Sequence, residues 1–132
     1  MRRRSSDTAG ARYVDRRAVT ESLREAARRG LARDRRIRRV ILFGSFADGT
    51  ATAASDADVL VVLESSPHRR RMDRIPELTE IFTGLDIAID IIPVTEDELS
   101  RETARPGSFL STVLESGVEL ASASPTESRA AT

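Results

Sequence analysis

The chain has 132 residues, and its 21 Lys and Arg residues balance its 21 Asp and Glu residues, so the formal net charge is zero. This length is sufficient for one domain with a single core. The absence of cysteine excludes disulfides, zinc–thiolate centres and cysteine nucleophiles. No apolar run approaches the length of a membrane-spanning helix, and no apolar segment follows the basic start, so we expect a cytoplasmic protein.

Charge is unevenly distributed along the sequence. Residues 1–40 contain 14 Arg and 5 Asp or Glu, a balance of +9, whereas residues 41–132 contain 7 Arg and 16 Asp or Glu, a balance of −9. The basic part could be a solvated helix and tail, or it could attract an acidic partner or nucleic acid. No aromatic residues interrupt the arginine run "RDRRIRRV", so base stacking is not supported and nucleic acid is not the expected partner.

The first predicted element is a helix. Residues 1–17, including Tyr13, are polar and lack periodicity, so we expect a disordered Arg-rich segment followed by one domain over 18–120. Thr20 can cap the helix, and apolar residues recur at helical spacing as far as Arg33.

Three apolar runs predict strands. The first, Val40–Phe43, is stopped by Gly44, and the second, Val59–Leu63, follows a small polar stretch with the composition of a turn or short helix. The third is "LDIAIDIIPV", which we expect to end at Pro93. Between the second and third strands, a helical pattern begins near Ile75, where Pro76 fits the first turn, and stops at Gly84.

Two further helices are predicted after the third strand. Thr95 and Glu98 form the pattern of a capping box, and a last short helix ends at Gly117. Residues 121–132 are rich in Ser and Ala, and we expect a disordered tail. Strands that alternate with helices predict an α/β fold with a small mixed β-sheet and packed helices.

Three aspartates suggest a metal site. Asp56 and Asp58 flank one alanine at the start of a strand, so their side chains project to the same side. Asp90 lies within an apolar strand, where an unpaired charge is costly. If the strands are neighbours, the three carboxylates can hold Mg²⁺. Asp86 shares the face of Asp90 but lies near the beginning of the strand, so Asp90 is favoured as the ligand.

A Gly-Ser turn could supply the phosphate contacts. Gly44 permits a tight turn and close backbone approach of a ligand, and Ser45 offers a hydroxyl and an N–H. Each feature has a simpler interpretation when taken singly, because Asp56 could cap a turn, Asp58 could be a strand-edge charge and Gly44 could merely end a strand. His68 lies in a polar loop and is expected at the surface. The four phenylalanines are expected in the core or at its rim.

The stretch "GSFADGTATAASDAD", followed by Asp90 in a later strand, resembles the nucleotidyltransferase superfamily, also called DNA polymerase beta-like. That superfamily has a G-S pair, a spacer, a D-x-D pair and a third acidic residue. The size and layout are similar to those of the minimal nucleotidyltransferases, over roughly residues 20–120. Members of that family often accompany a HEPN-domain partner.

The resemblance implies a nucleotidyltransferase fold and transfer of AMP from ATP to an acceptor hydroxyl. It implies that Asp56, Asp58 and Asp90 bind two Mg²⁺ ions and take part in catalysis, while Gly44 and Ser45 bind the β- and γ-phosphates. It further implies a HEPN-type toxin as the protein that is modified, with this chain as the antitoxin.

One residue departs from the family pattern. The residue before Gly49 is often Arg in these families, whereas here it is Asp48. Three alternatives therefore stay open: an inactive binding module that covers its partner, nucleotidylation of a small molecule such as an aminoglycoside, and RNA binding through residues 1–40. A second copy of the chain could also complete the acceptor site, so a homo-oligomer is a further expectation.

Overall fold

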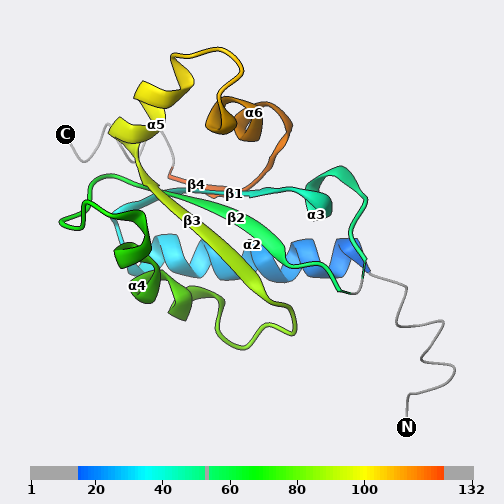
Figure 1. The fold of residues 1–132 in the computed structure, drawn as a ribbon. Helices are drawn as coiled ribbons and strands as arrows, with labels where there is room; N and C mark the ends of the chain where they lie inside the picture. The colour runs from blue at the N-terminus through cyan, green and yellow to red at the C-terminus, as the bar shows by residue number, and fades with distance from the viewer. Residues whose placement is uncertain (1–14, 53, 124–132) are drawn as a thin grey trace, which may run out of the picture.

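The structure is a computed structural model that describes residues 15–52 and 54–123. Its centre is a four-stranded sheet in the order β3-β2-β1-β4, with helices on both faces (Figure 1). The predicted α/β fold with a small mixed sheet is confirmed, because β2 and β3 are parallel and the other neighbours are antiparallel. The disorder predicted for residues 1–14 and 124–132 lies outside the described residues, as does Tyr13.

The first described helix, α2 (Arg16–Arg33), begins earlier than the sequence predicted. Asp15, rather than Thr20, is the N-cap, and its side chain accepts a hydrogen bond from the backbone N–H of Ala18 at 3.0 Å. Arg16 and Arg17, which we expected in the disordered segment, therefore form the first turn. A carboxylate cap satisfies an N–H group that a helix starting without one would leave unpaired.

The helix α2 leads into an antiparallel pair of strands, β1 (Ile37–Phe43) and β2 (Ala57–Leu63). A four-residue helix, α3 (Ser45–Asp48), follows β1 directly. Both strands begin before the apolar runs that predicted them. The arginines at the start of β1 still pair in the sheet, because Arg39 is opposite Val62.

The helical pattern after β2 forms three short segments: η1 (Arg71–Arg74), α4 (Ile75–Thr79) and η2 (Glu80–Phe82). Pro76 lies in the first turn of α4, as predicted. Gly84 follows with φ +92°, consistent with its predicted role as a helix stop.

The third strand, β3 (Ile89–Thr95), is shifted along the sequence from its predicted position. It begins four residues later than the apolar run and continues through Pro93, so the prediction that Pro93 ends it is wrong. The reason is that β3 is an edge strand. Proline is tolerated where its missing N–H faces away from the neighbouring strand.

The C-terminal part contains α5 (Glu96–Thr103), α6 (Phe109–Ser116) and β4 (Val118–Ser122). The predicted capping box is present, since the Thr95 side chain and the Glu98 side chain each accept from the other residue's backbone N–H. The end of α6 at Gly117 is also confirmed. Strand β4 was not predicted, and it places Ala121 and Ser122 in the sheet instead of in the expected tail.

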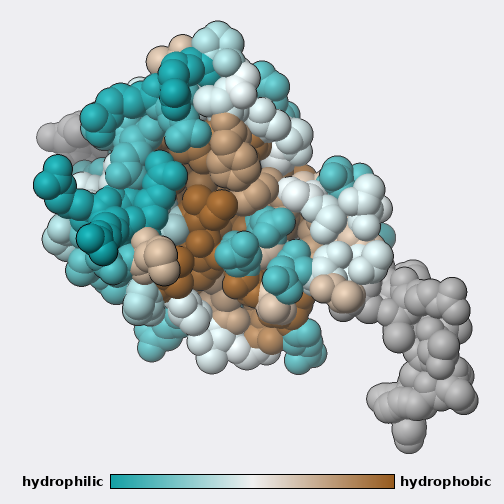
Figure 2. Space-filling view, in the orientation of Figure 1, coloured by the Kyte–Doolittle hydropathy of each residue, from teal (hydrophilic) through white to brown (hydrophobic). Residues whose placement is uncertain are grey.

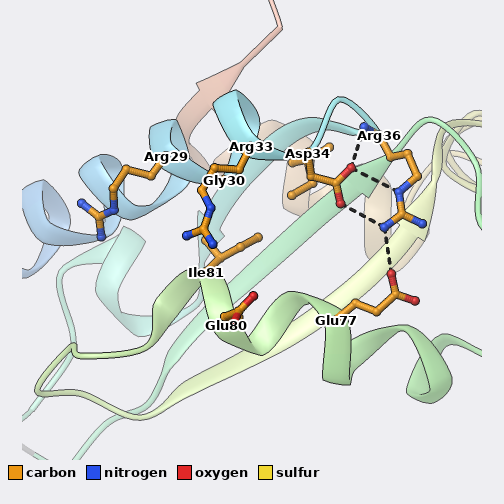
Figure 3. A pocket seen from close by; sticks show the side chains of 9 residues that line it. Arg29, Gly30, Arg33, Asp34, Arg36, Glu77, Glu80 and Ile81 are labelled. Atoms are coloured by element: carbon orange, nitrogen blue, oxygen red, sulfur yellow. Dashed lines mark hydrogen bonds and ion pairs between the residues drawn. The ribbon is translucent and has the colours of Figure 1, made fainter.

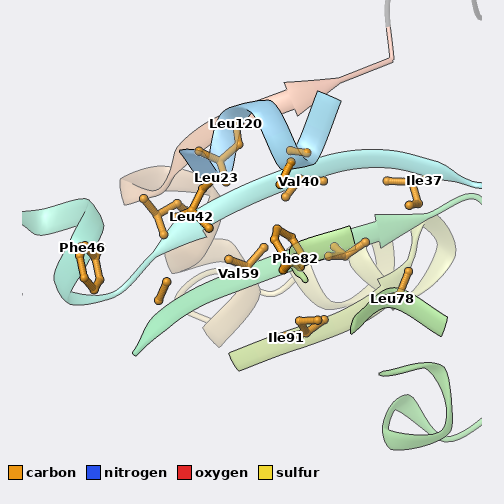
Figure 4. Close-up of a cluster of buried hydrophobic side chains, with 14 of the residues drawn as sticks. Leu23, Ile37, Val40, Leu42, Phe46, Val59, Leu78, Phe82, Ile91 and Leu120 are labelled. Carbon is orange, nitrogen blue, oxygen red and sulfur yellow. The ribbon is translucent and has the colours of Figure 1, made fainter. Parts of the chain in front are cut away.

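The sheet separates two apolar layers. Helix α2 and segment η2 pack on one face, where the larger cluster includes Leu23, Phe46, Val59 and Phe82 (Figure 4). Helices α5 and α6 pack on the other face, against Leu60 and neighbouring residues. Among the described helices, none is both long and apolar enough to cross a membrane.

Candidate active site

The turn after β1 lies directly against the start of β2. Gly44 has φ +77° and ψ −151°, a combination that is accessible essentially to glycine alone. A Cβ atom at this position would collide with the Asp58 carboxylate oxygen Oδ2. The antiparallel register explains the proximity, because Phe43 is the Cα partner of Asp58. The structure therefore brings the predicted Gly-Ser turn and the predicted carboxylate pair together.

Asp58 and Asp90 are neighbours across the parallel pair of strands. The register of β2 and β3 makes them Cα partners near the N-terminal ends of both strands. Strand alternation places both side chains on the sheet face that α5 and α6 cover further along, in the same rows as Leu60 and Ile92. The sequence left open whether the third strand lies beside the second, and the structure shows that it does.

Asp56 lies in the loop immediately before β2 and is exposed, as is Asp90, whereas Asp58 is half-buried. Burial raises the pKa of the Asp58 carboxyl above its ordinary value, and the negative charges of Asp90 and then Asp56 raise it further. Asp56 and Asp90 are therefore close enough to oppose the ionisation of Asp58. Asp86, the alternative to Asp90, lies in the bend before β3 and has no register partner on β2.

The three carboxylates have the chemistry of ligands for a cation. None of the three accepts a hydrogen bond or forms an ion pair with another residue in 15–52 or 54–123, although the chain is rich in arginine. Oxygen ligands with unbalanced charge are what Mg²⁺ prefers. Within those same ranges, however, no three Asp, Glu, His or Cys side chains converge as a ready-formed metal site. The structure thus shows three acidic residues near one another, of which Asp58 and Asp90 are register partners on adjacent strands.

Polar residues form hydrogen bonds with one another at the end of α3. The Asp48 carboxylate accepts from the backbone N–H of Thr50 at 3.0 Å and from its hydroxyl at 2.7 Å. These hydrogen bonds lower the pKa of Asp48, as does the positive charge of Arg16 to a smaller extent. The acidic residue that departs from the family pattern is therefore satisfied within its own turn.

Apolar side chains border the acidic group. The rings of Phe43 and Phe109 meet edge to face, with centroids 5.7 Å apart, and Phe109 is 51% exposed. Figure 2 shows an apolar band across this view of the molecule, with hydrophilic surface beside it. The expectation that the phenylalanines lie in the core or at its rim is confirmed for the buried Phe46 and Phe82 and for Phe43, which packs against the second cluster, but is wrong for Phe109, whose ring is half exposed.

A separate concavity of about 270 Å³ lies between α2 and the α4–η2 segment (Figure 3). Arg29 and Arg33 line its α2 wall, and Arg36 bridges Asp34 and Glu77 at its end. It shares no residue with the acidic group. His68, the only histidine in the sequence, lies nearby at the surface, as expected, with 41% of its side chain exposed. Its Nε2 is 3.1 Å from a carboxylate oxygen of Glu77.

The fold and the acidic group together define a class, that of proteins with a Gly-Ser turn facing paired strand carboxylates. Residues 23–118 match the family described as "Nucleotidyltransferase domain", and the chain belongs to that family. A protein of Methanocaldococcus jannaschii named "Putative protein adenylyltransferase" is 50% identical over 71 residues, which cover 51% of this chain. The matched region spans about half of that relative, 48% of its length.

Two solved structures share the fold. The crystal structure of a "putative nucleotidyltransferase" from Sulfolobus solfataricus has a TM-score of 0.54 and 22% identity, covering 65% of this chain and 75% of that one. The crystal structure described as "the toxin-antitoxin with AMP-PNP" has a TM-score of 0.50 and 19% identity, covering 80% of this chain and 78% of that one. At these levels of sequence identity, the similarity shows a shared fold alone.

Proposed function

We propose that this chain transfers AMP from ATP to a hydroxyl group of a partner protein. The observation that carries the proposal is the alignment of Asp58 with Asp90 across parallel strands, with the Gly44 turn packed against the Asp58 carboxylate. The name of the Methanocaldococcus jannaschii relative supports adenylyl transfer to protein as the reaction.

Each residue of the group has a role in this proposal. Gly44 and Ser45 bind the β- and γ-phosphates, because the turn lets a ligand approach the backbone and the Ser45 hydroxyl has no partner among the described residues. Asp56, Asp58 and Asp90 hold Mg²⁺, with two ions expected. Bound Mg²⁺ supplies positive charge that neutralises the phosphates and the developing charge on the leaving pyrophosphate.

Asp90 has an additional role in the proposal because it is exposed and lies on the edge strand. The acceptor hydroxyl attacks the α-phosphorus from the side opposite the pyrophosphate, and Asp90 accepts its proton. Pyrophosphate leaves towards the Gly44–Ser45 turn. The product is an AMP ester of the acceptor.

For the acceptor we propose a HEPN-type toxin, modified on a hydroxyl side chain such as tyrosine, with this chain as its antitoxin. Support comes from the fold shared with a structure described as a toxin–antitoxin with AMP-PNP. The acidic group is open at the edge strand β3, so an acceptor carried by another protein can reach it.

The test is incubation with ATP labelled at the α-phosphate, Mg²⁺ and a candidate HEPN-type toxin. We expect label on the toxin and a mass increase of one AMP or more. Both should be lost with chelator and in Asp56→Asn and Asp58→Asn. A stable complex without label would instead identify a binding module, and label on an aminoglycoside alone would overturn the protein acceptor.

A further inference from the structure

A residue far from the motif in sequence contacts the short helix α3, which directly follows Gly44. Arg16, the first residue of α2, donates from Nε to the carbonyl oxygen of Phe46 at 2.8 Å and from Nη2 to that of Ala47 at 3.0 Å. The guanidinium thus donates to two successive carbonyl oxygens of α3 through two of its nitrogens, a forked geometry that lysine cannot provide.

Arg16 supplies the hydrogen bonds that these two carbonyl oxygens accept. Helix α3 has only four residues, and its backbone N–H groups and those of the following turn donate to the carbonyls of Gly44 and Ser45. No backbone N–H of a described residue donates to the carbonyls of Phe46 or Ala47. A helix this short cannot fix its own position, because nucleation of a helical turn is unfavourable.

Charge and packing place the guanidinium at the same end of α3. Its positive charge acts on the Asp48 carboxylate. A Cβ atom built on Gly49 would lie 3.6 Å from Arg16 Nη1. Two contacts therefore hold helix α3 in place: the hydrogen bonds from Arg16 and the buried side chain of Phe46.

We infer that Arg16 is a positioning residue for nucleotide binding. It fixes the C-terminal end of α3 so that Gly44 and Ser45, at the other end, present a preformed turn to the triphosphate of ATP. This inference rests on the proposed function of the turn. It assigns a role to a residue outside the Gly-Ser and aspartate motifs, which sequence reasoning placed in a disordered segment.

The test compares Arg16→Ala and Arg16→Lys with Arg17→Ala. Arg17 is a matched control because it occupies the same helical turn, is also exposed and has no polar contact with a described residue. ATP affinity is measured with Mg²⁺ by calorimetry, and hydrogen exchange of the amides of residues 47–51 is measured without nucleotide. Where the toxin assay is active, KM for ATP and kcat are also determined.

We expect Arg16→Ala to weaken ATP binding about tenfold, as for the loss of hydrogen bonds from a charged donor. Its KM for ATP should rise while kcat is little changed, and amide exchange of residues 47–51 should be faster. Arg16→Lys should be intermediate, since an ammonium cannot reproduce the fork. Arg17→Ala should behave as the wild type in each measurement.

Unchanged ATP affinity in Arg16→Ala would overturn the inference, as would an equal loss in Arg17→Ala. Faster exchange with unchanged affinity would overturn the role in binding and leave only a structural contact. Failure of the wild type to bind ATP would overturn the proposed function, and with it the role of Arg16 in binding. This outcome is seen in the wild type alone, so it can be distinguished from a failure of the inference about Arg16. The exchange measurement needs no ATP, so it still reports whether Arg16 holds α3.

Discussion

The ionisation of Asp58 is opposed first by its burial and then by the charges of Asp90 and Asp56. Because its pKa is raised from 3.8, the folded chain holds a proton more firmly than the unfolded chain does. The contribution of this group to stability therefore falls as pH rises through the window between 3.8 and the raised pKa. The same charge that the proposed chemistry needs thus weakens the metal-free fold.

The corresponding prediction concerns Asp58→Asn in metal-free buffer. Removing one of three repelling carboxylates should raise the Tm at pH 7 by about 2 °C, although AMP transfer should be lost. The gain should disappear at a pH low enough to protonate Asp58 in the wild type. Thermal unfolding followed by circular dichroism from pH 3 to pH 8 measures both effects, and a lower Tm at pH 7 would contradict the repulsion.

Gly44 gives a second prediction at the scale of one residue. Gly44→Ala combines a strained backbone with a clash against Asp58, so we expect a loss of at least about 2 kcal/mol in unfolding free energy and loss of ATP binding. Gly84→Ala is the matched control, because Gly84 also has positive φ, +92°, but has open space at the Cβ position. It should cost about 1 kcal/mol and leave ATP binding intact.

Chemical denaturation gives the two free energies, and calorimetry gives the two affinities. Equal costs for Gly44→Ala and Gly84→Ala would mean that contact with Asp58 adds nothing to the backbone strain. Normal ATP binding by a folded Gly44→Ala variant would contradict the role of this turn in phosphate binding.

At the scale of elements, a buried cation ties α5 to the segment before α4. Arg74 is only 3% exposed and donates from Nη1 and Nη2 to the Glu98 carboxylate at 2.8 and 3.0 Å. It also donates to the carbonyl oxygens of His68, Arg69 and Pro93. The guanidinium therefore fixes the long connection after β2 and covers the outer edge of β3 at Pro93.

Glu98→Gln tests this connection. Hydrogen bonds from Arg74, assisted by the Thr95 N–H and the charges of Arg74 and Arg71, hold the pKa of Glu98 at about 2, against burial and below its ordinary 4.5. The folded chain thus binds fewer protons than the unfolded chain between these values. The stabilisation is complete above pH 4.5 and is lost as pH falls towards 2.

We expect Glu98→Gln to lower the unfolding free energy at pH 7 by about 2–4 kcal/mol, because it leaves a buried guanidinium without its counter-charge. The difference from the wild type should shrink towards pH 2. Asp97→Asn, on the same helix, removes an exposed pair with Arg101 and should cost less than about 0.5 kcal/mol. A similar, pH-independent loss in both variants would contradict the role of the buried pair.

Local patterns predicted the elements whose signals lie within a few residues. The apolar runs gave β1 and β2, and the Thr95–Glu98 spacing gave the start of α5. Strand β4 was missed because the alternation of Val118, Glu119 and Leu120 is too short to indicate a strand by itself, and β4 is in the sheet only through pairing with β1, which is distant in sequence. The continuation of β3 through Pro93 likewise depends on its position at the sheet edge, which only the tertiary structure defines.

For the candidate site, the sequence predicted the residue types but not their supports. The sequence placed Asp58 and Asp90 at strands but left the adjacency of those strands as a condition, and only the structure shows the parallel pairing that makes them register partners. The contact between Arg16 and α3 spans 30 residues and has no short-range signal. An N-cap at Asp15 was a readable clue that α2 starts early enough to bring Arg16 within the fold.

At the scale of the whole molecule, the acidic group and its cation should act as one unit with ATP. A ligand that binds only the folded chain stabilises it by about 2.7 kcal/mol at a hundred times its Kd. We therefore expect ATP with Mg²⁺ to raise the Tm by about 5–10 °C. ATP with chelator, or Mg²⁺ alone, should have a much smaller effect, because the phosphates would face unbalanced carboxylates and the cation would lack phosphate ligands.

Asp90→Asn and Asp86→Asn localise this effect to the site. Both remove one exposed carboxylate from the same stretch of chain, but only Asp90 is aligned with Asp58 in the sheet. The Tm increase with ATP and Mg²⁺ should be reduced in Asp90→Asn and retained in Asp86→Asn. An equal response of both variants would mean that the strand register does not define the metal–nucleotide site. A full wild-type response to ATP in chelator would show that binding needs no divalent cation.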